Sequence, residues 1–513
     1  KGEAWPAGRT GRYGAAIHYS AFHTDGYRRL STARTQQLHA ALDVDMGDGW
    51  TGEVRLRLAD APEARNPGAL TAAEVASDPR TAAPNNIARG ADKSVRQEQL
   101  SATVRHRRAN GGDASLTLFA LQRDLENPIA APPPGPFVRE AGIWNGIDRT
   151  AGGARLAFTV PLGAAAPVLL AGADLQLLRD DRVNLRALAG VPTDSVLADQ
   201  RERVTEIGPF ARLEWTRGAW TVTGGVRWDR LTFRVADRHL TDGADQSGRR
   251  VMQAGSWQAG ASLRVSDAFI PWVAVASAFE TPTTTELVNE AGGSVGFNTT
   301  LGPQRATSVE AGVRGRAGWL QWDVTAFTAR VRDALVQQQE QDGRASFANA
   351  GRTRQRGLEV SVTARAARDF DLLAAWTFAD YTFRDYRIRR GATVDTLDGN
   401  RLAAVPKHQL RLSARGRLGP VRVGADHTIT SGVFADDANT LRTEGTRAGG
   451  TDLRRWLDRA WRSPVAIRPF AGVQNLWDRG YVGSVTINGF GGRVFEPSPG
   501  RTVYVGVEWS GER

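Results

Sequence analysis

The sequence predicts an all-β fold, a single large antiparallel β-barrel that crosses a membrane, and three observations carry this prediction. Segments of alternating polarity recur from about Val95 onward, the connectors between them are in turn very short and long, and tryptophans gather beside the short connectors. Bacterial outer-membrane barrels sort their connectors in this way, with short periplasmic turns and long extracellular loops. Soluble sandwiches do not normally do so.

The short connectors contain the residues that tight antiparallel turns need. Gly, Asn and Asp supply the positive φ angles of hairpin turns. Such connectors are Met46-Gly47-Asp48-Gly49, Asn110-Gly111-Gly112-Asp113, Arg217-Gly218, Ala317-Gly318 and Gly416 to Pro420. The long connectors are expected at 61–93, 181–203, 281–304, 386–405 and 434–450.

Composition favours one large architecture over several small domains. The 513 residues contain no Pro/Ser linker, no charge block and no run of about 18 apolar residues that would indicate a transmembrane helix. Of the 66 basic residues, all but Lys1, Lys93 and Lys407 are arginines, and the formal net charge is +11. Genomic base composition, anionic outer-leaflet lipid or an anionic ligand could each explain this bias. Nucleic acid fits poorly, because the arginines are spread along the whole chain.

Period-two alternation is clearest between Trp220 and Asp229. Trp220, Val222, Val226 and Trp228 fall on one face, which suits lipid, and Arg227 and Asp229 fall on the other. Arg155 is expected to face inward in the same way. Tryptophans near short turns or the chain end indicate an aromatic girdle on one rim: Trp50, Trp215, Trp220, Trp272, Trp319, Trp461 and Trp509.

About twenty strands are expected, and an even number would put both visible ends on the short-turn side. Their predicted ranges are 12–24, 33–46, 50–60, 95–108, 113–125, 143–162, 168–180, 203–216, 219–235, 249–265, 269–281, 304–317, 319–337, 353–367, 370–387, 405–416, 420–432, 450–461, 464–484 and 499–509.

Specific motifs occur along the chain in the same order as in one known family. The motifs that carry the resemblance are Phe279-Glu280-Thr281-Pro282 to Leu287, Leu301-Gly302-Pro303-Gln304, Asn349-Ala350-Gly351 with Gly357-Leu358-Glu359, Gly399-Asn400-Arg401-Leu402, Val405-Pro406-Lys407-His408, Asn475-Leu476-Trp477-Asp478-Arg479, and Glu496-Pro497-Ser498-Pro499-Gly500-Arg501. Together they resemble the TonB-dependent outer-membrane receptors. Upstream motifs such as Thr24-Asp25-Gly26-Tyr27-Arg28 extend the resemblance over essentially the whole chain.

The resemblance implies a 22-stranded barrel filled by an N-terminal plug. Residues 1–513 are then expected to be the barrel domain, with the plug and the first two strands missing and no signal peptide at Lys1. The chain departs from the family in two places. Ser510-Gly511-Glu512-Arg513 follow Trp509, where the family usually ends on an aromatic residue. Without a plug, a barrel of this width would be an open pore.

Ligand contacts are expected from the long loops and the upper lumen. Aromatic side chains give flat apolar contacts, and arginines pair with carboxylates or catecholate-like oxygens. The candidates are Phe137, Arg139, Trp144, Tyr386, Arg387, Arg389, Arg390, Phe490 and Arg493. The competing interpretation is that basic loops simply face anionic lipopolysaccharide.

Nothing in the sequence argues for catalysis, a cofactor or a metal site. The seven histidines show no metal-ligand spacing. The stretch Asp436-Asp437-Ala438-Asn439-Thr440 superficially resembles a calcium loop, but it lacks the Gly and Glu that should follow, so turn chemistry is the better interpretation. Gly489-Phe490-Gly491-Gly492 precedes no helix, which disfavours a phosphate cradle.

By resemblance, the chain is expected to be a monomeric receptor in the bacterial outer membrane that imports a ferric siderophore with energy from the TonB system. Expected partners are the substrate, outer-membrane lipid and lipopolysaccharide, the TonB complex through the missing plug, and the barrel-assembly machinery. The alternative substrates are pyrroloquinoline quinone, cobalamin or another small organic ligand. The quinone is included because Tyr481 to Val485 with Phe495 to Arg501 resembles a branch of the family that contains a pyrroloquinoline quinone importer. A passive porin and a soluble β-rich binding protein are the rival classes.

Overall fold

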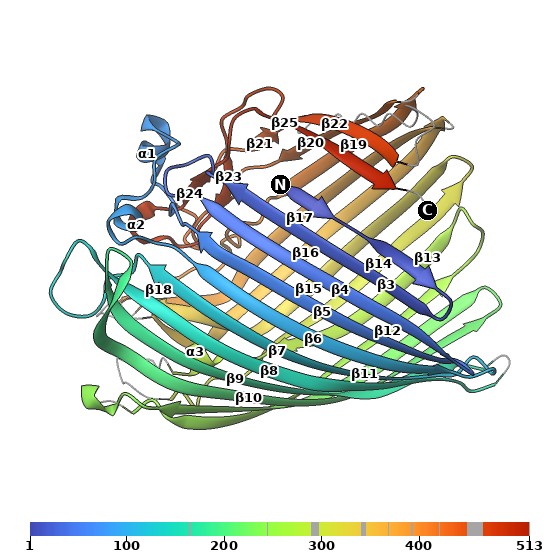
Figure 1. Cartoon of the computed structure of the whole chain (residues 1–513), viewed down its shortest axis with the longest axis horizontal. Coiled ribbons are helices and arrows are strands. Elements are labelled where there is room, and N and C mark those ends of the chain that lie inside the picture. The colour runs from blue at the N-terminus through green and yellow to red at the C-terminus, as the bar shows by residue number, and fades with distance from the viewer. Residues whose placement is uncertain are drawn as a thin grey trace.

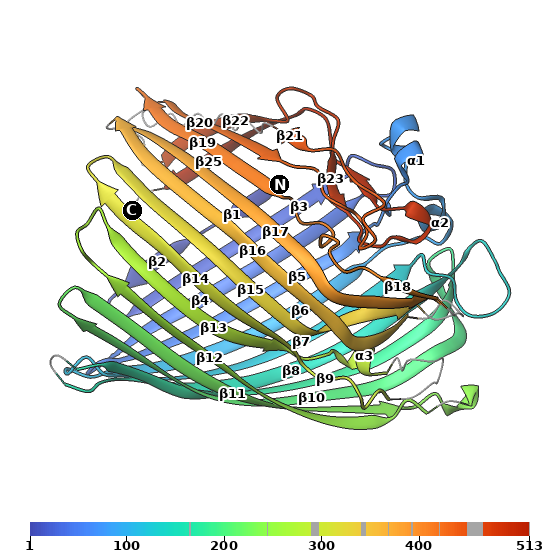
Figure 2. The same cartoon turned by 180° about the vertical axis from the view of Figure 1, so that it is seen from behind.

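A computed structural model shows a hollow wall of tilted antiparallel strands, with front and back walls seen in Figure 1 and Figure 2. It describes all residues except 164–165, 244, 289–296, 340–344, 368, 391–392, 420, 449–464 and 512–513. The all-β prediction is confirmed. The described helices and strands are β1 (Gly2–Ala4), β2 (Ala7–Thr10), β3 (Tyr13–Thr24), β4 (Ala33–Gly47), β5 (Trp50–Ala64), α1 (Ala72–Ser77), α2 (Pro84–Ala88), β6 (Ser94–Arg107), β7 (Asp113–Ile129), β8 (Ala141–Pro161), β9 (Val168–Leu188), β10 (Val191–Arg217), β11 (Trp220–Asp237), η1 (Leu240–Asp242), β12 (Gly248–Leu263), β13 (Ile270–Glu280), α3 (Thr284–Leu287), β14 (Gln304–Ala317), β15 (Leu320–Gln339), β16 (Ala345–Ala367), β17 (Phe370–Arg390), β18 (Thr393–Thr396), β19 (His408–Leu418), β20 (Val421–Thr430), β21 (Thr446–Ala448), β22 (Val465–Gln474), β23 (Val482–Val485), η2 (Phe490–Gly492), β24 (Phe495–Pro497) and β25 (Thr502–Gly511).

Neighbouring strands in the chain pair with each other along most of the wall. The ladders from β3 to β17 are consecutive antiparallel pairs, and β17, β19 and β20 continue them. β22 pairs with β25, and β23 with β24. Among the described residues no ladder joins β25 to β1 or β22 to β21.

The predicted tight turns are confirmed. In the turn between β4 and β5, Asp48 and Gly49 have φ of 50° and 80°, which is the conformation of a type I′ hairpin. A Cβ on Gly49 would lie 2.1 Å from the Arg107 carbonyl oxygen, so glycine is required there. Four predicted rim tryptophans at this end are well exposed: Trp50, Trp220, Trp319 and Trp509. The predicted strand 450–461 and Trp461 lie outside the described residues.

The stretch 181–203 is a hairpin rather than the predicted long loop. β9 and β10 extend to Leu188 and from Val191, with Ala189 and Gly190 at positive φ in the turn. Charges lie on both faces of these extensions, as in Asp180 and Asp181. β9 alternates as far as Ala187, but the ladder register shifts on β10 between Pro192 and Ala198, where Pro192-Thr193-Asp194-Ser195 read as loop residues.

Two further boundaries differ from the prediction. The first strand lies before residue 12: β1 and β2 are separated at Trp5-Pro6 and both pair with β3, with Gly2 opposite Ala21. Proline has no N–H to donate to the β-ladder, so Pro6 interrupts the strand and weakens its signal in the sequence. The chain therefore enters from the long-connector end and β25 ends at the short-turn end, so the two ends do not share one side. The predicted strand 464–484 ends at Gln474, because Asn475 has a φ of 48°.

Among the residues that the structure describes, the buried apolar clusters lie at the long-connector end of the wall and not at its centre. One cluster packs Leu231, Phe233 and Met252 against Leu287 of α3 and Leu301. A second surrounds Phe383 and Tyr386 in β17, and the third joins Ala435, Val494 and Phe495. We call this end of the barrel the mouth. The three clusters pack its long connectors against the strands and against one another.

Candidate functional site

The long connectors at one side of the mouth form a connected assembly, which we call the collar. It comprises residues 65–93, 130–140, 381–390, 393–402, 431–445 and 475–501. Leu70, which is fully buried, exchanges backbone hydrogen bonds with Phe495. Leu70 and Phe495 thus tie the first long connector to the last. Figure 1 shows α1, α2, β23 and β24 gathered at this place.

An ion pair reinforces the same joint. Thr71 and Glu74 form a capping box at the start of α1, and Arg493 Nη1 lies 2.5 Å from Glu74 Oε2. Burial alone would raise the pKa of Glu74, but the hydrogen bonds from Thr71 and Arg493 and the charge of Arg493 outweigh it and hold that pKa below its usual range. Arg493, a predicted ligand contact, is therefore already engaged within the collar.

The segment that resembles a calcium loop closes on itself. The Asp436 carboxylate accepts hydrogen bonds from the Thr440 backbone and hydroxyl and from the Leu441 N–H. Asp437 and Asn488 bond reciprocally, at 3.0 and 2.9 Å. These bonds confirm the turn interpretation. Among the described residues no group of three His, Cys, Asp or Glu side chains could hold a metal ion.

Tyr386 is a structural member of the collar. Its side chain is 4% exposed, its ring stacks on Phe383 at 4.4 Å, and its hydroxyl lies 3.5 Å from Asp437 Oδ2. Its role as a ligand contact stays a prediction, and its burial leaves little surface for one. Arg387 beside it is exposed. The side chains of Arg389 and Arg390 lie outside the described residues.

The first predicted loop group lies on the neighbouring connector. Phe137 is 80% exposed, and Arg139 is exposed with its carbonyl oxygen accepting from Arg89 Nε at 3.3 Å. Trp144 is half-buried in β8. Phe490, in η2, is 89% exposed. Phe137, Arg139, Phe490 and Arg387 are therefore the predicted contacts with exposed side chains, and they lie on three separate connectors.

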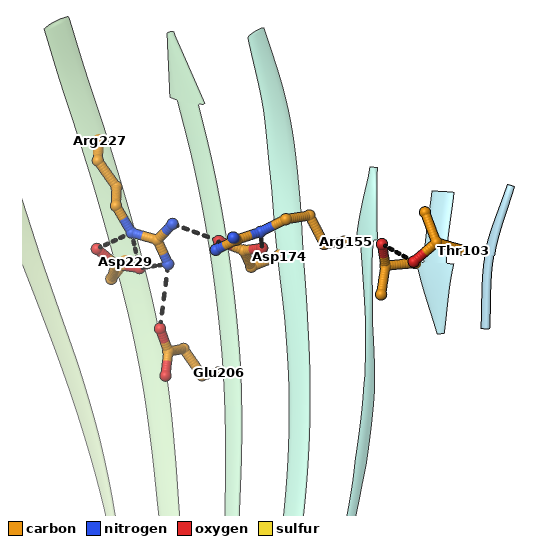
Figure 3. A network of polar contacts seen from close by, with 7 residues as sticks. Thr103, Arg155, Asp174, Glu206, Arg227 and Asp229 are labelled. Carbon is orange, nitrogen blue, oxygen red and sulfur yellow. Dashed lines mark hydrogen bonds and ion pairs between the residues drawn. The ribbon is translucent and has the colours of Figure 1, made fainter. Parts of the chain in front are cut away.

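The inner wall holds a network of ion pairs around Arg227 (Figure 3). From β11, its guanidinium reaches Asp174 Oδ2 at 2.5 Å on β9, Asp229 Oδ1 at 2.6 Å and Glu206 Oε1 at 3.2 Å on β10. Arg155 on β8 binds the same Asp174 at 2.5 Å. The predicted inward direction of Arg155, Arg227 and Asp229 is confirmed. The partners Asp174 and Glu206 were missed, because finding them requires the register between strands.

Nearer the mouth, a second set of ion pairs holds α3 against the wall. Arg182 Nε donates to Glu202 Oε1 at 2.8 Å, and its Nη2 reaches the Thr285 hydroxyl at 3.3 Å. The Thr284 hydroxyl donates to the other Glu202 oxygen. Glu202 is 1% exposed, so these contacts satisfy a buried carboxylate. The long connector that carries α3 is thereby fastened inside the mouth.

The described residues contain no helix that is both long and apolar enough to cross a membrane. A family model described as "TonB dependent receptor-like, beta-barrel" matches residues 9–476. The chain belongs to this family. As a TonB-dependent receptor barrel it resides in the outer membrane of Gram-negative bacteria. The predicted fold and localisation are thereby confirmed.

Solved structures of other TonB-dependent receptors share the fold. The unliganded ferric citrate transporter FecA superposes with a TM-score of 0.80 at 17% identity, covering 98% of this chain and 74% of FecA. The ferric yersiniabactin uptake receptor FyuA of Yersinia pestis gives 0.78 at 16%, covering 98% of this chain and 77% of FyuA. The ferrioxamine receptor of Yersinia enterocolitica is 27% identical over 137 residues, which is 26% of this chain and 18% of that receptor. That curated relative is thus matched over less than a fifth of its length.

Proposed function

We propose that this receptor barrel binds a ferric siderophore at the collar and admits it to the lumen, with transport energised by the TonB system. The observation that carries the proposal is the mouth itself, where exposed Phe137, Arg387 and Phe490 stand above an inner wall of paired charges. Flat aromatic faces and free guanidinium groups suit a chelate with aromatic and anionic donor groups. The wall charges are paired with one another, so they offer a polar path without an isolated charge that would hold the ligand.

The named relatives support a metal chelate as the ligand class. FecA is a ferric citrate transporter, FyuA takes up ferric yersiniabactin, and the Yersinia enterocolitica relative is a ferrioxamine receptor. A copper transporter, OprC, has the same fold at a TM-score of 0.76, so the binding test must also establish which metal the ligand carries. Pyrroloquinoline quinone, cobalamin and other small organic ligands are the alternative substrates.

The test is equilibrium binding of the purified full chain to a panel of ferric hydroxamate, catecholate and carboxylate siderophores, with cobalamin and pyrroloquinoline quinone as competitors. We expect one ferric class to bind, and Phe137→Ala with Arg387→Gln to weaken that binding about tenfold or more. Exposed Arg96 on β6, which is not part of the collar, provides the control variant Arg96→Gln. Binding of the quinone or cobalamin with no ferric chelate bound would overturn the siderophore assignment.

Energy coupling requires a separate experiment. We propose that residues preceding Lys1 in the complete gene product supply a plug that closes the lumen and engages TonB, as the longer matched structures suggest. Ferric chelate uptake by cells that carry the complete gene should then disappear when TonB is deleted. A passive porin would instead admit small solutes at equal rates with and without TonB. The barrel-assembly machinery, lipopolysaccharide and a monomeric state stay predictions.

A further inference from the structure

Two histidines face each other on neighbouring strands of the wall. His18 on β3 lies directly opposite His39 on β4, and their ring centres are 5.7 Å apart at an interplanar angle of 31°. In the next ladder, His39 lies opposite Arg57 on β5. Because paired residues on adjacent strands point to the same face, the three side chains form one row. β3, β4 and β5 lie side by side in the wall (Figure 1).

The row faces the lumen. Ile17 and Tyr19, the neighbours of His18 along β3, are exposed on the other face of the sheet. The ladders continue that face from Ile17 to exposed Leu100 on β6, as expected of the lipid side. Successive side chains of a strand point to opposite faces, so the row points away from lipid. It lies near the middle of β4, below the collar.

The two imidazoles have nitrogen atoms that the chain does not use. In the part of the chain that the structure describes, neither His18 nor His39 takes part in a hydrogen bond or an ion pair. His18 Nε2 is shielded from solvent and has no partner, and the contacts of this ring are with His39 and, edge-on at 5.1 Å, with Trp5. Shielded polar atoms are rarely left without a partner in folded proteins. The unpaired nitrogen therefore indicates a ligand that comes from outside the chain.

The spacing of the rings fits a shared metal ion. Imidazole nitrogen is a good ligand for Cu²⁺, Ni²⁺ and Zn²⁺. Two imidazoles bound to one such ion at about 2.1 Å per nitrogen have ring centres about 5 Å apart. A small rotation of His18 and His39 from their 5.7 Å separation reaches this arrangement. Among the described residues no group of three His, Cys, Asp or Glu side chains could complete such a site, so the remaining ligands must come from another molecule.

Arg57 determines the charge of that molecule. It is exposed, and within the described residues it has no ion pair with a carboxylate. A guanidinium beside His39 repels a bare divalent cation, but it attracts a carboxylate that accompanies the cation. The row thus combines two metal ligands with one anion-binding group.

We propose that His18, His39 and Arg57 bind an anionic chelate of Cu²⁺, Ni²⁺ or Zn²⁺ that has two adjacent coordination positions open. The two imidazole nitrogens replace the two water molecules at these positions, and the Arg57 guanidinium binds a carboxylate of the chelator. No other bond is made or broken. The site lies in the lumen and is independent of ferric siderophore binding at the collar.

The test is calorimetric titration of the full chain, purified without a polyhistidine tag, with Ni²⁺–nitrilotriacetate and Ni²⁺–EDTA. Both chelates are anionic, but nitrilotriacetate leaves two adjacent positions of the ion open and EDTA leaves none. We expect the first chelate to bind and the second not to bind. His18→Gln and His39→Gln should each weaken binding at least about tenfold, because a single imidazole cannot chelate the ion. His106→Gln is the matched control: its ring stacks on Trp50 at 4.4 Å, and binding should not change.

Arg57→Gln tests the charge of the ligand. This variant should bind Ni²⁺–nitrilotriacetate about threefold to tenfold more weakly than the wild type, but hydrated Ni²⁺ at least as tightly. Equal weakening of the two probes would contradict the assignment of an anionic chelate. The Phe137→Ala and Arg387→Gln changes should leave the binding of Ni²⁺–nitrilotriacetate unaltered, so this result is independent of the siderophore experiment.

A second readout uses the wild type alone, so it does not depend on how the variants fold. Pulsed electron paramagnetic resonance of bound Cu²⁺–iminodiacetate counts the imidazoles on the copper ion, and we expect two. Fewer than two imidazoles, binding of Ni²⁺–EDTA as tight as that of Ni²⁺–nitrilotriacetate, or unchanged binding in both histidine variants would each overturn the proposal.

Discussion

At the scale of single residues, the chain manages charge by pairing it across strands on the inner wall. Arg227 serves three carboxylates from β9, β10 and β11, and two of them, Asp174 and Asp229, are nearly fully buried. A buried carboxylate without a partner is costly, so the single arginine supports several groups at once. Its loss should therefore have a larger effect than the loss of an exposed pair.

Replacing Arg227 with Met should lower the free energy of unfolding by about 2–3 kcal/mol. The change leaves Asp174 with Arg155 alone and leaves Asp229 without its ion-pair partner. Arg212→Met is the matched control: Arg212 pairs with Glu214 on β10, and both side chains are about half exposed. That variant should lose about 0.5 kcal/mol or less. Denaturant unfolding in detergent measures both, and equal losses would contradict the account of Arg227.

The ion pair between Glu74 and Arg493 should make the collar sensitive to acid. A carboxyl whose pKa is lowered on folding contributes stability above its unfolded pKa and loses it as the pH falls through the lowered value. Amides near 70–76 and 490–495 should therefore exchange faster at pH 3 to 4 than at pH 7 once intrinsic rates are corrected. In Glu74→Gln this pH difference should shrink. If the pH dependence of exchange is unchanged in that variant, groups other than Glu74 cause the acid sensitivity.

The pairing of Glu74 with Arg493 could not have been read from the sequence. The two residues are 419 positions apart, and only the folded wall with its collar brings their connectors together. The inward direction of Arg155 and Arg227 could be predicted, because period-two alternation is local. The prediction of Arg493 and Tyr386 as possible ligand contacts rested on residue type, which cannot distinguish a free side chain from one engaged by a neighbouring loop.

At the scale of elements, the strands were predictable where one face meets lipid and the other the lumen. β8 and β11 match their predicted ranges closely, and the turns at Gly49, Gly218 and Gly318 fall where expected. The hairpin extension of β9 and β10 was missed although β9 keeps alternating up to Ala187, because the opposing stretch of β10, Pro192 to Ser195, carries turn-forming residues and shifts in the ladder register. β1 and β2 were missed because Pro6 interrupts the ladder and their side chains are exposed on both faces.

The tip of the β9–β10 hairpin fits closely against the connector that carries α2. Gly90 has a φ of 58°, and a Cβ there would lie 2.4 Å from the Ala189 carbonyl oxygen. Gly218 has the same φ in a short turn with nothing within 4 Å of its Cβ position. Alanine at either position brings about 1 kcal/mol of backbone strain, but only Gly90→Ala adds a collision with the hairpin tip.

Gly90→Ala should therefore destabilise the mouth more than Gly218→Ala destabilises its turn. The expected result is faster hydrogen exchange at residues 186–192 in the Gly90→Ala variant, with no change there in Gly218→Ala. Unfolding temperatures measured in the same detergent would show whether the effect stays local. Equal exchange at 186–192 in both variants would show that the hairpin tip does not depend on this contact.

At the scale of the whole molecule, the wall separates three environments with three kinds of surface. The lipid side carries apolar residues such as Val222 and Val226, the lumen carries paired charge around Arg227, and the outer face beyond the apolar stretch carries exposed arginines such as Arg203 and Arg234. The overall charge of +11 could not distinguish these places, because composition sums over all of them. Cross-strand register is what assigns each arginine to a partner or leaves it without one.

The collar has a consequence for how the mouth can move. Its joints run in single file, from Ala189 to Glu140, from Arg139 to Arg89, from Glu74 to Arg493, from Asn488 to Asp437 and from Asn439 to Arg401. Connectors joined in series cannot swing as separate flaps. We therefore expect a displacement at one joint to pass to the next, so that a ligand in contact with Phe137 would shift Arg387 without touching it.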